Sequence, residues 1–288
     1  MADTTLSADA PEEGEIDLEE VRRMRRRRNE RIASWALPIA VVLLTIGFWH
    51  WMAVGGEKPN YLLPSPLRVG DTLVQDWPIL FEALLVTLQV TLLALATAIV
   101  LGVGLAVLFS LSTWVEMSLF PYAVILQVTP IVAIAPLIVI YIDNNTVALV
   151  VCAWIVAFFP ILSNTTLGLN SADHNLRDLF RIYGANRWQT LRLLEMPAAM
   201  PYFLGGLRIA GGLSLIGAIV AEYVAGTAGA RGGLAFRILE AGYRLNFPRM
   251  FAALALVAGL GLLIFATTTL VNHLLLRKWH ESAVRRER

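Results

Sequence analysis

Long apolar stretches alternate with short polar segments along the 288 residues of this chain. A helix needs roughly 20 apolar residues to cross a hydrocarbon core about 30 Å thick. Six stretches meet this length and are predicted to be transmembrane helices: about 35–53, 79–110, 118–142, 146–168, 201–226 and 249–276. The second exceeds the membrane thickness, so it must tilt or extend into the aqueous phase. The pattern therefore predicts an all-α integral membrane protein.

Polar segments divide the chain into three parts. Residues 1–34 are predicted to form a disordered, basic N-terminal segment, because 1–20 is acidic and polar with no apolar core. The membrane domain covers 35–276 and contains a polar loop at about 170–199, and 277–288 forms a basic tail. Charges precede the first span by a long margin, which argues against a cleavable signal peptide.

The polar loop at 170–199 has the pattern of two short amphipathic helices. Its first part places apolar residues at i, i+3, i+4 and i+7, on one helical face: Leu176, Leu179, Phe180 and Tyr183. Gly184 follows, where helices commonly end with a positive φ. Asn186 with Gln189 is typical of an N-cap, and Pro197 is predicted to end the second helix. A hairpin of this kind between spans fits a soluble docking partner.

Prolines and glycines mark two of the spans. Pro130 and Pro136 each remove a backbone hydrogen bond from the third span and are predicted to bend it. The fifth span is rich in small residues, which allow helices to approach closely: Gly205, Gly206, Gly211, Gly212, Gly217 and Ala221. The partner helix lies either in a second subunit, across a dimer interface, or in the same subunit.

Composition and charge support a membrane protein with a defined orientation. Hydrophobic residues make up 57% and charged residues 16%, whereas soluble domains carry about 25% charged residues. With six spans and both termini cytosolic, 16 of the 23 Lys and Arg residues lie inside, in the N-terminal cluster, the 170–199 loop and the tail. The arginine cluster beside the first span fits contact with anionic membrane lipid rather than with nucleic acid.

No arrangement of residues typical of a common catalytic site is evident in the sequence. A P-loop needs a Gly-Lys-Ser/Thr sequence, and neither Lys58 nor Lys278 provides one. The four histidines are scattered without metal-ligand spacing, so no metal site is expected. Cys152, the only cysteine, is predicted to pack inside the fourth span. We therefore expect neither an enzyme nor a cofactor in this chain.

Several segments resemble the permeases of ABC importers. Asp178-Leu179-Phe180, Gly184, Leu194, Met196 and Pro197 keep the spacing of the family's cytoplasmic coupling loop, with Asp for Glu and bulky residues for two alanines. Leu63–Pro66, Val128–Leu137, Gly217–Glu222 and Gly232–Leu234 resemble the nitrate/sulfonate/taurine type. The resemblance implies two permease copies, two separate ATPase subunits that bind ATP, and a periplasmic binding protein at the bacterial inner membrane. It also favours a dimer-interface role for the glycine-rich span.

The resemblance also suggests roles for individual residues. Those implied in coupling to the ATPase are Asp178, Leu179, Phe180, Tyr183, Gly184, Trp188, Leu194, Met196 and Pro197. Polar, aromatic or charged side chains at membrane depth are candidates for the substrate path or gate, although each also fits a packing or interfacial role. They are Gln127, Thr129, Trp154, Asn164, Arg208 and Glu222.

Two other function classes fit the sequence less well than an importer permease does. A membrane-embedded hydrolase needs a nucleophile with a base at membrane depth, and no histidine is centrally placed. A secondary transporter should show inverted internal repeats, and none is evident. The substrate class stays open between nitrate, sulfonates or taurine, and pyrimidine thiamine precursors. Ile238–Arg244 resembles the last branch.

Overall fold

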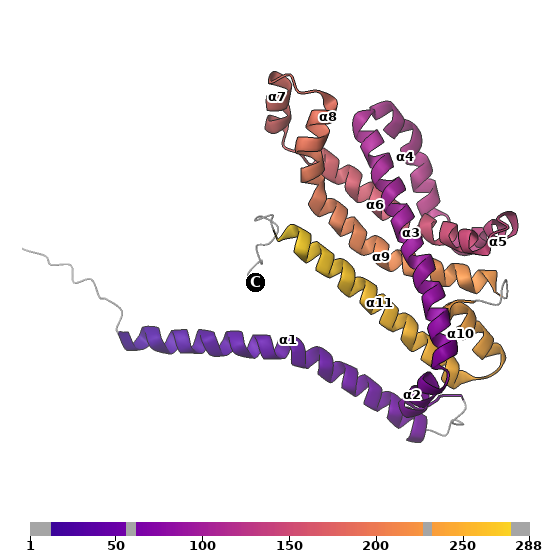
Figure 1. The fold of residues 1–288 in the computed structure, drawn as a ribbon. Helices are drawn as coiled ribbons and strands as arrows, with labels where there is room; N and C mark the ends of the chain where they lie inside the picture. The colour runs from indigo at the N-terminus through magenta and orange to yellow at the C-terminus, as the bar shows by residue number, and fades with distance from the viewer. Residues whose placement is uncertain (1–12, 56–61, 227–231, 278–288) are drawn as a thin grey trace, which may run out of the picture. The chain divides into compact units, whose positions relative to one another are not determined.

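The computed structural model describes residues 13–55, 62–226 and 232–277, and the regular elements within these ranges are all helices (Figure 1). The chain divides into two compact units, Met1–Pro66 and Leu67–Arg288. Five of the described helices are long and apolar enough to cross a membrane, and a bent helix pair is the sixth candidate. The predicted all-α membrane fold is confirmed.

The first unit contains one long helix, α1 (Glu13–Gly55), of which Ala36–Gly55 is a candidate membrane span. Residues 13–34 are helical, so the prediction of disorder was wrong for this stretch, while residues 1–12 lie outside the described part. Glu, Arg, Leu and Met, which favour helices, dominate these positions. Arg26 and Glu30 pair at 3.2 Å across one turn. Intrinsic helix propensity and continuity with the apolar span explain why this charged stretch is helical.

The second unit is a helical bundle built on α6. Its elements in chain order are α2 (Pro66–Gln75), α3 (Trp77–Leu111), α4 (Thr113–Val128), α5 (Ile131–Tyr141), α6 (Asn145–Asn170), α7 (His174–Ile182), α8 (Arg187–Thr190), the π-helical segment η1 (Leu191–Glu195), α9 (Met196–Ala225), α10 (Leu234–Tyr243) and α11 (Phe247–Leu276). Helix α6 packs extensively against both α3 and α9 (Figure 1). Helix α11 packs against α9 and α10.

The third predicted span, 118–142, is a broken helix rather than a continuous one. It starts earlier, at Thr113, and α4 and α5 meet at 101°. Thr129 between them has an extended backbone, with φ −71° and ψ 122°. Pro130 explains the break, because proline disfavours a helical conformation of the preceding residue. Pro136 lies inside α5 without ending it.

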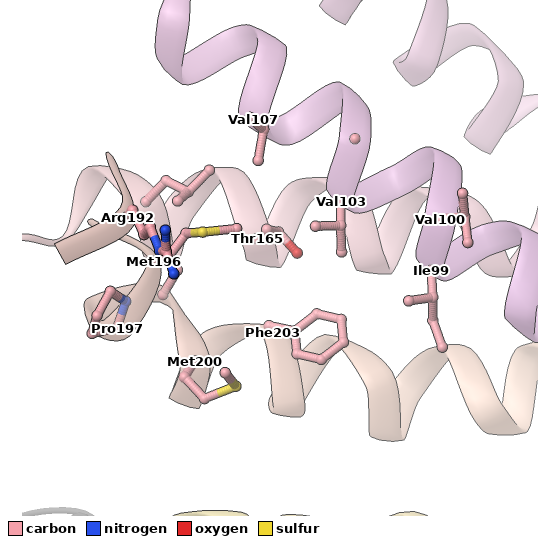
Figure 2. A pocket seen from close by; sticks show the side chains of 13 residues that line it. Ile99, Val100, Val103, Val107, Thr165, Arg192, Met196, Pro197, Met200 and Phe203 are labelled. Atoms are coloured by element: carbon pink, nitrogen blue, oxygen red, sulfur yellow. The ribbon is translucent and has the colours of Figure 1, made fainter. Parts of the chain in front are cut away.

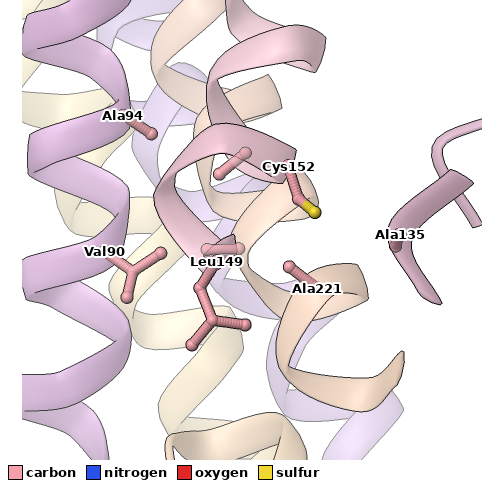
Figure 3. Close-up of a cluster of buried hydrophobic side chains, with 8 residues drawn as sticks. Val90, Ala94, Ala135, Leu149, Cys152 and Ala221 are labelled. Atoms are coloured by element: carbon pink, nitrogen blue, oxygen red, sulfur yellow. The ribbon is translucent and has the colours of Figure 1, made fainter. Parts of the chain in front are cut away.

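The core between these helices is built largely from small side chains. One cluster joins Val90 and Ala94 of α3, Leu149 and Cys152 of α6, and Ala221 of α9 (Figure 3). Cys152 is fully buried there, which confirms its predicted packing role. Alanine-sized residues let the helix backbones approach closely, and this close packing fixes the relative positions of α3, α6 and α9.

Some glycines of α9 lie against α6, and others lie on a side of α9 that no other part of the described chain covers. A Cβ added to Gly206 would lie 2.7 Å from the carbonyl oxygen of Pro160, and one added to Gly217 would lie 2.8 Å from Cα of Ala153. Both glycines therefore pack against α6 of the same subunit, which corrects their predicted place at a dimer interface. Gly205 and Gly212, in contrast, border open space.

Candidate functional site

A helical hairpin projects from the bundle where α6 ends and α9 begins (Figure 1). Helix α7 starts at the N-cap Asp173, whose carboxylate accepts a hydrogen bond from the amide of Asn175 at 2.8 Å. After α7, Gly184 has φ 70°, and the amide of Ala185 donates to the Phe180 carbonyl at 2.9 Å. The predicted glycine turn is confirmed, and it reverses the chain between α7 and α8.

The second helix of the hairpin begins as predicted and ends differently. Asn186 and Gln189 form a capping box, with each side chain accepting from the other's backbone amide at 2.8 Å. Pro197 does not end the helix: Arg187–Ala225 is continuous through the π-helical segment. Pro197 lies in the first turn of α9, where the wider π turn that precedes it accommodates the missing N–H.

The outer surface of the hairpin is apolar and exposed. Tyr183 is 82% exposed, Ile182 81% and Trp188 65%, while Leu179 is about half exposed and Phe180 is partly covered. We call Leu179, Ile182, Tyr183 and Trp188 the hairpin face. Ile182 was missed by the sequence reasoning, although its spacing of three residues from Leu179 was a usable signal. Large apolar patches that are exposed to water mark interaction sites.

Polar contacts fasten the hairpin to the ends of the membrane helices. Glu195 accepts a hydrogen bond from the Ser110 hydroxyl at 2.7 Å and pairs with Arg177 at 3.4 Å. Arg177 also donates to the carbonyl oxygen of Leu169 at 2.8 Å, and Arg187 to that of Leu111 at 2.7 Å. These guanidinium groups join the hairpin to the last turns of α6 and α3.

A polar pocket of about 500 Å³ lies between the hairpin and the end of α3. Asp178 and Arg181 line it together with Arg177, Arg187 and Glu195. Asp178 therefore takes part in this polar pocket, while Ile182, one turn further along α7, belongs to the exposed hairpin face.

The remaining predicted coupling residues lie away from the hairpin face. Figure 2 shows an apolar groove of about 710 Å³ between α3, α6 and α9, with Arg192 and Met196 at one end. Met196 and Pro197 line this groove, and Leu194 is half-buried. Leu191 is buried in a cluster with Phe109 and Leu162, which anchors the base of the hairpin in the bundle.

The six predicted path residues do not form one cluster. Gln127 is exposed near the α4–α5 break. At the break itself, the Thr129 hydroxyl donates to the Ile125 carbonyl at 2.7 Å. Asn164 donates to the Pro160 carbonyl at 2.8 Å, and Trp154 packs beside Phe158 in the core.

The two charged members lie on α9. Arg208 is exposed and lies over the ring of Phe265 of α11, 4.4 Å from its centroid. Glu222 is buried, and its carboxylate accepts a hydrogen bond from the amide of Ala235 at 3.0 Å. Glu222 is thus bound to the start of α10, rather than being an interfacial acid open to water or to a docking protein.

Within the described residues, no group of three or more His, Cys, Asp or Glu side chains could hold a metal ion. The candidate site in the described residues therefore consists of an exposed apolar hairpin face, polar contacts that hold the hairpin to α3 and α6, and a broken helix pair.

Comparison with known proteins shows that the chain is similar to membrane components of transport systems. Residues 98–279 match the family model described as "Binding-protein-dependent transport system inner membrane component". The riboflavin transport system permease protein RibX of Chloroflexus aurantiacus is 35% identical over 85% of this chain and 90% of its own length. The formylaminopyrimidine transport permease protein ThiX of Halalkalibacterium halodurans is 33% identical over 83% of this chain and 94% of its own length.

Solved structures support the same fold. The chain resembles a subunit of an amino acid ABC transporter crystallised with histidines, with a TM-score of 0.58 and 18% identity, over 72% of this chain and 97% of that one. It also resembles a subunit of the inward-facing MetNI methionine ABC transporter, with a TM-score of 0.58 over 68% of this chain and 96% of that one.

Proposed function

The chain belongs to the family of binding-protein-dependent transport system inner membrane components, and on this premise we propose that it carries a small nutrient across the membrane with energy from a separate ATPase subunit. It is the multi-pass permease subunit of an ABC importer of the inner membrane and not an enzyme. Beyond this family membership, we propose a surface that binds the ATPase subunit, a dimer of two permease copies, and a class of substrate.

The exposed hairpin face is the observation that carries this proposal. Tyr183 and Trp188 present aromatic side chains to solvent on a hairpin fastened to α3 and α6. Aromatic anchors dominate the binding energy of typical protein interfaces. An ATPase subunit that binds this face and moves when it binds ATP would displace the hairpin. Arg177 and Arg187 would pass that displacement to α6 and α3. Exposed Arg181 on α7 adds positive charge that would steer an acidic partner surface.

Co-expression with a candidate ABC ATPase subunit from the same organism tests the proposal. A tag on the permease should recover the ATPase in equal amounts, and ATP turnover should require the ATPase subunit. ATP turnover by the purified permease alone, scaling with its concentration, would contradict the assignment.

A second copy of the chain is proposed to cover the open stripe of α9. Gly205, Ile209, Gly212, Ile216 and Tyr223 follow one side of this helix, and Ile209, Ile216 and Tyr223 are exposed large apolar residues. Two copies related by a two-fold axis would enclose a path between them. Exposed Gln127 and Arg208 are then the predicted path residues best placed to face it, with Thr129 at the α4–α5 break and Glu222 near the end of α9. Asn164 and Trp154, which pack inside the subunit, would support its wall.

Paired glycine variants distinguish the two surfaces of α9. Gly212→Leu should fit a single subunit, because an added Cβ meets nothing within 4 Å, yet it should reduce the dimer fraction measured by native mass spectrometry. Gly217→Leu should instead lower the melting temperature, because its side chain would meet the Ala153 backbone of α6. Unchanged dimerisation of Gly212→Leu would show that this stripe faces lipid.

Both termini and the hairpin are proposed to lie in the cytosol, because 16 of the 23 basic residues then lie inside. In a Cys152→Ser background, Asn175→Cys on α7 and Tyr243→Cys on α10 both place an exposed thiol in solvent. A membrane-impermeant maleimide added to intact spheroplasts should label only the second, and permeabilisation should expose the first. Labelling of both in intact cells would contradict this orientation.

The substrate is proposed to be a small heterocyclic nutrient of the pyrimidine-precursor class. The relatives named for riboflavin and formylaminopyrimidine are 35% and 33% identical, whereas those named for sulfonates, nitrate and taurine are 26–28% identical. A thermal-shift screen of the associated binding protein against pyrimidines, flavins, sulfonates and nitrate tests this choice. Stabilisation by sulfonates or nitrate alone would overturn it.

A further inference from the structure

We propose that Thr87 and Glu222 form a latch that holds helix α10 against the bundle, and that releasing this latch opens the translocation path at the end opposite the hairpin. The inference rests on the proposed transport function, since a path that admits and releases a substrate must open alternately at its two ends.

The latch consists of two hydrogen bonds to the first turn of α10. The amide of Leu234 donates to the Thr87 hydroxyl at 2.9 Å, and the amide of Ala235 donates to the Glu222 carboxylate at 3.0 Å. The first N–H groups of a helix have no partner within the helix, and they attract a negative charge. Because Thr87 belongs to α3 and Glu222 to α9, these two acceptors join α10 to two separate spans.

The burial of the latch makes its polar groups costly to leave unpaired. Glu222 is 3% exposed, Thr87 and Leu234 are fully buried, and one Glu222 oxygen has no hydrogen-bond partner within the described residues. Gly233, the N-cap of α10, contacts this carboxylate so closely that any Cβ would collide with it. In most helices an N-cap Ser or Asp accepts a hydrogen bond from the first amides. In α10 these amides instead donate to side chains of neighbouring spans, so the same hydrogen bonds cap α10 and hold it against the bundle.

Two residues with a positive φ lie on either side of α10 in the chain. Gly226, directly after α9, has φ 54°, and Leu245, between α10 and α11, has φ 55°. A leucine is strained in this left-handed region, and its side chain is largely exposed. A glycine turn and a strained residue therefore bracket the helix, and departure of α10 from the bundle would let Leu245 relax.

The surroundings of α10 are fixed by other contacts. Arg249 in the first turn of α11 binds Asp76, which precedes α3, through two hydrogen bonds of 2.6 and 2.9 Å. Within α10, Glu240 pairs with Arg237 at 2.8 Å and with Arg244 at 3.0 Å. The first contact joins α3 and α11 without α10, and the other two lie within α10 or at its end. Because α10 also packs against α11, release of the latch would separate α10 from α3 and α9 while its packing on α11 stays.

Cysteine labelling of the purified permease tests the latch itself. In a Cys152→Ser background, Ala241→Cys places a thiol at a buried position of α10, where an impermeant maleimide should react slowly. Thr87→Val and Glu222→Ala should each raise its labelling rate at least tenfold. Thr91→Val is the matched control, because Thr91 is equally buried one turn along α3 and its hydroxyl donates to the Thr87 carbonyl of its own helix. Glu222→Gln, which keeps an acceptor, should change the rate less than threefold. Equal rates in Thr87→Val and Thr91→Val would overturn the latch.

The assembled complex with its ATPase subunit tests the role of the latch in opening. If closure of α10 restrains the transport cycle, Thr87→Val should raise the basal ATP turnover of the complex at least threefold, while Thr91→Val should leave it unchanged. Faster labelling without any change in turnover would overturn the gating role. A wild-type permease that binds no ATPase subunit would instead count against the proposed function, because the labelling experiment needs no partner.

Discussion

A permease carrying Tyr183→Asp and Trp188→Asp should lose its ATPase subunit on co-purification while its spans still fold. Both side chains are exposed on the hairpin face and contribute little to the core. An interface hot spot is worth about 2 kcal/mol or more, and about 1.4 kcal/mol is tenfold in affinity. Burying two carboxylates in the same interface adds a desolvation cost. We therefore expect recovery of the ATPase to fall at least tenfold, measured by quantitative pull-down.

Tyr243→Asp provides a matched control for this variant. Tyr243 is 81% exposed, as Tyr183 is at 82%, but it lies at the end of α10, away from the hairpin. The same chemical change there should leave recovery of the ATPase at the wild-type level. Equal recovery from both variants would mean that the ATPase binds elsewhere.

Gly184→Val should uncouple the permease from ATP hydrolysis through a change in backbone conformation alone. Gly184 has φ 70°, and an added Cβ would meet no atom within 4 Å, so there is no clash to confuse the result. A side chain in the left-handed region costs about 1–2 kcal/mol, and a β-branched one is especially disfavoured. The angle between α7 and α8 should change, and substrate-stimulated ATP turnover of the complex should fall about tenfold while membrane insertion is unaffected.

The Gly184→Asn variant separates the effect of backbone conformation from the effect of adding a side chain. Asparagine tolerates a positive φ much better than valine does. It should therefore retain most of the stimulated turnover. Turnover in the valine variant equal to that of the asparagine variant would show that the turn geometry is not required for coupling.

Features that depend on neighbouring residues were predictable from the sequence. The apolar spans follow from the length needed to cross a bilayer, and the capping box of Asn186 and Gln189 follows from spacing alone. Gly184 was placed in a positive φ because it follows the last apolar position of α7. In each case the atoms that interact are separated by only a few residues.

The errors concern residues with more than one local solution. A proline such as Pro197 can stand either after the end of a helix or in its first turn. Here it stands in the first turn of α9, directly after the π-helical segment. Pro130 and Pro136 occur in one span, yet only the first breaks it. The charged segment before the first span was predicted to be disordered, but its helix formers continue α1 as far back as Glu13.

The sequence by itself determined the membrane class, the order of the apolar segments and the local geometry of the hairpin turn, because hydrophobic length and short-range hydrogen bonds depend on consecutive residues. Only the tertiary structure decided which side of each helix is covered. It assigned Gly217 to packing inside the subunit and left Gly212 open. It also joined Leu234 to Thr87 across 147 residues and Arg249 to Asp76 across 173. Contacts at that separation depend on how α3, α9 and α11 pack in space, and no periodicity along the chain records that packing.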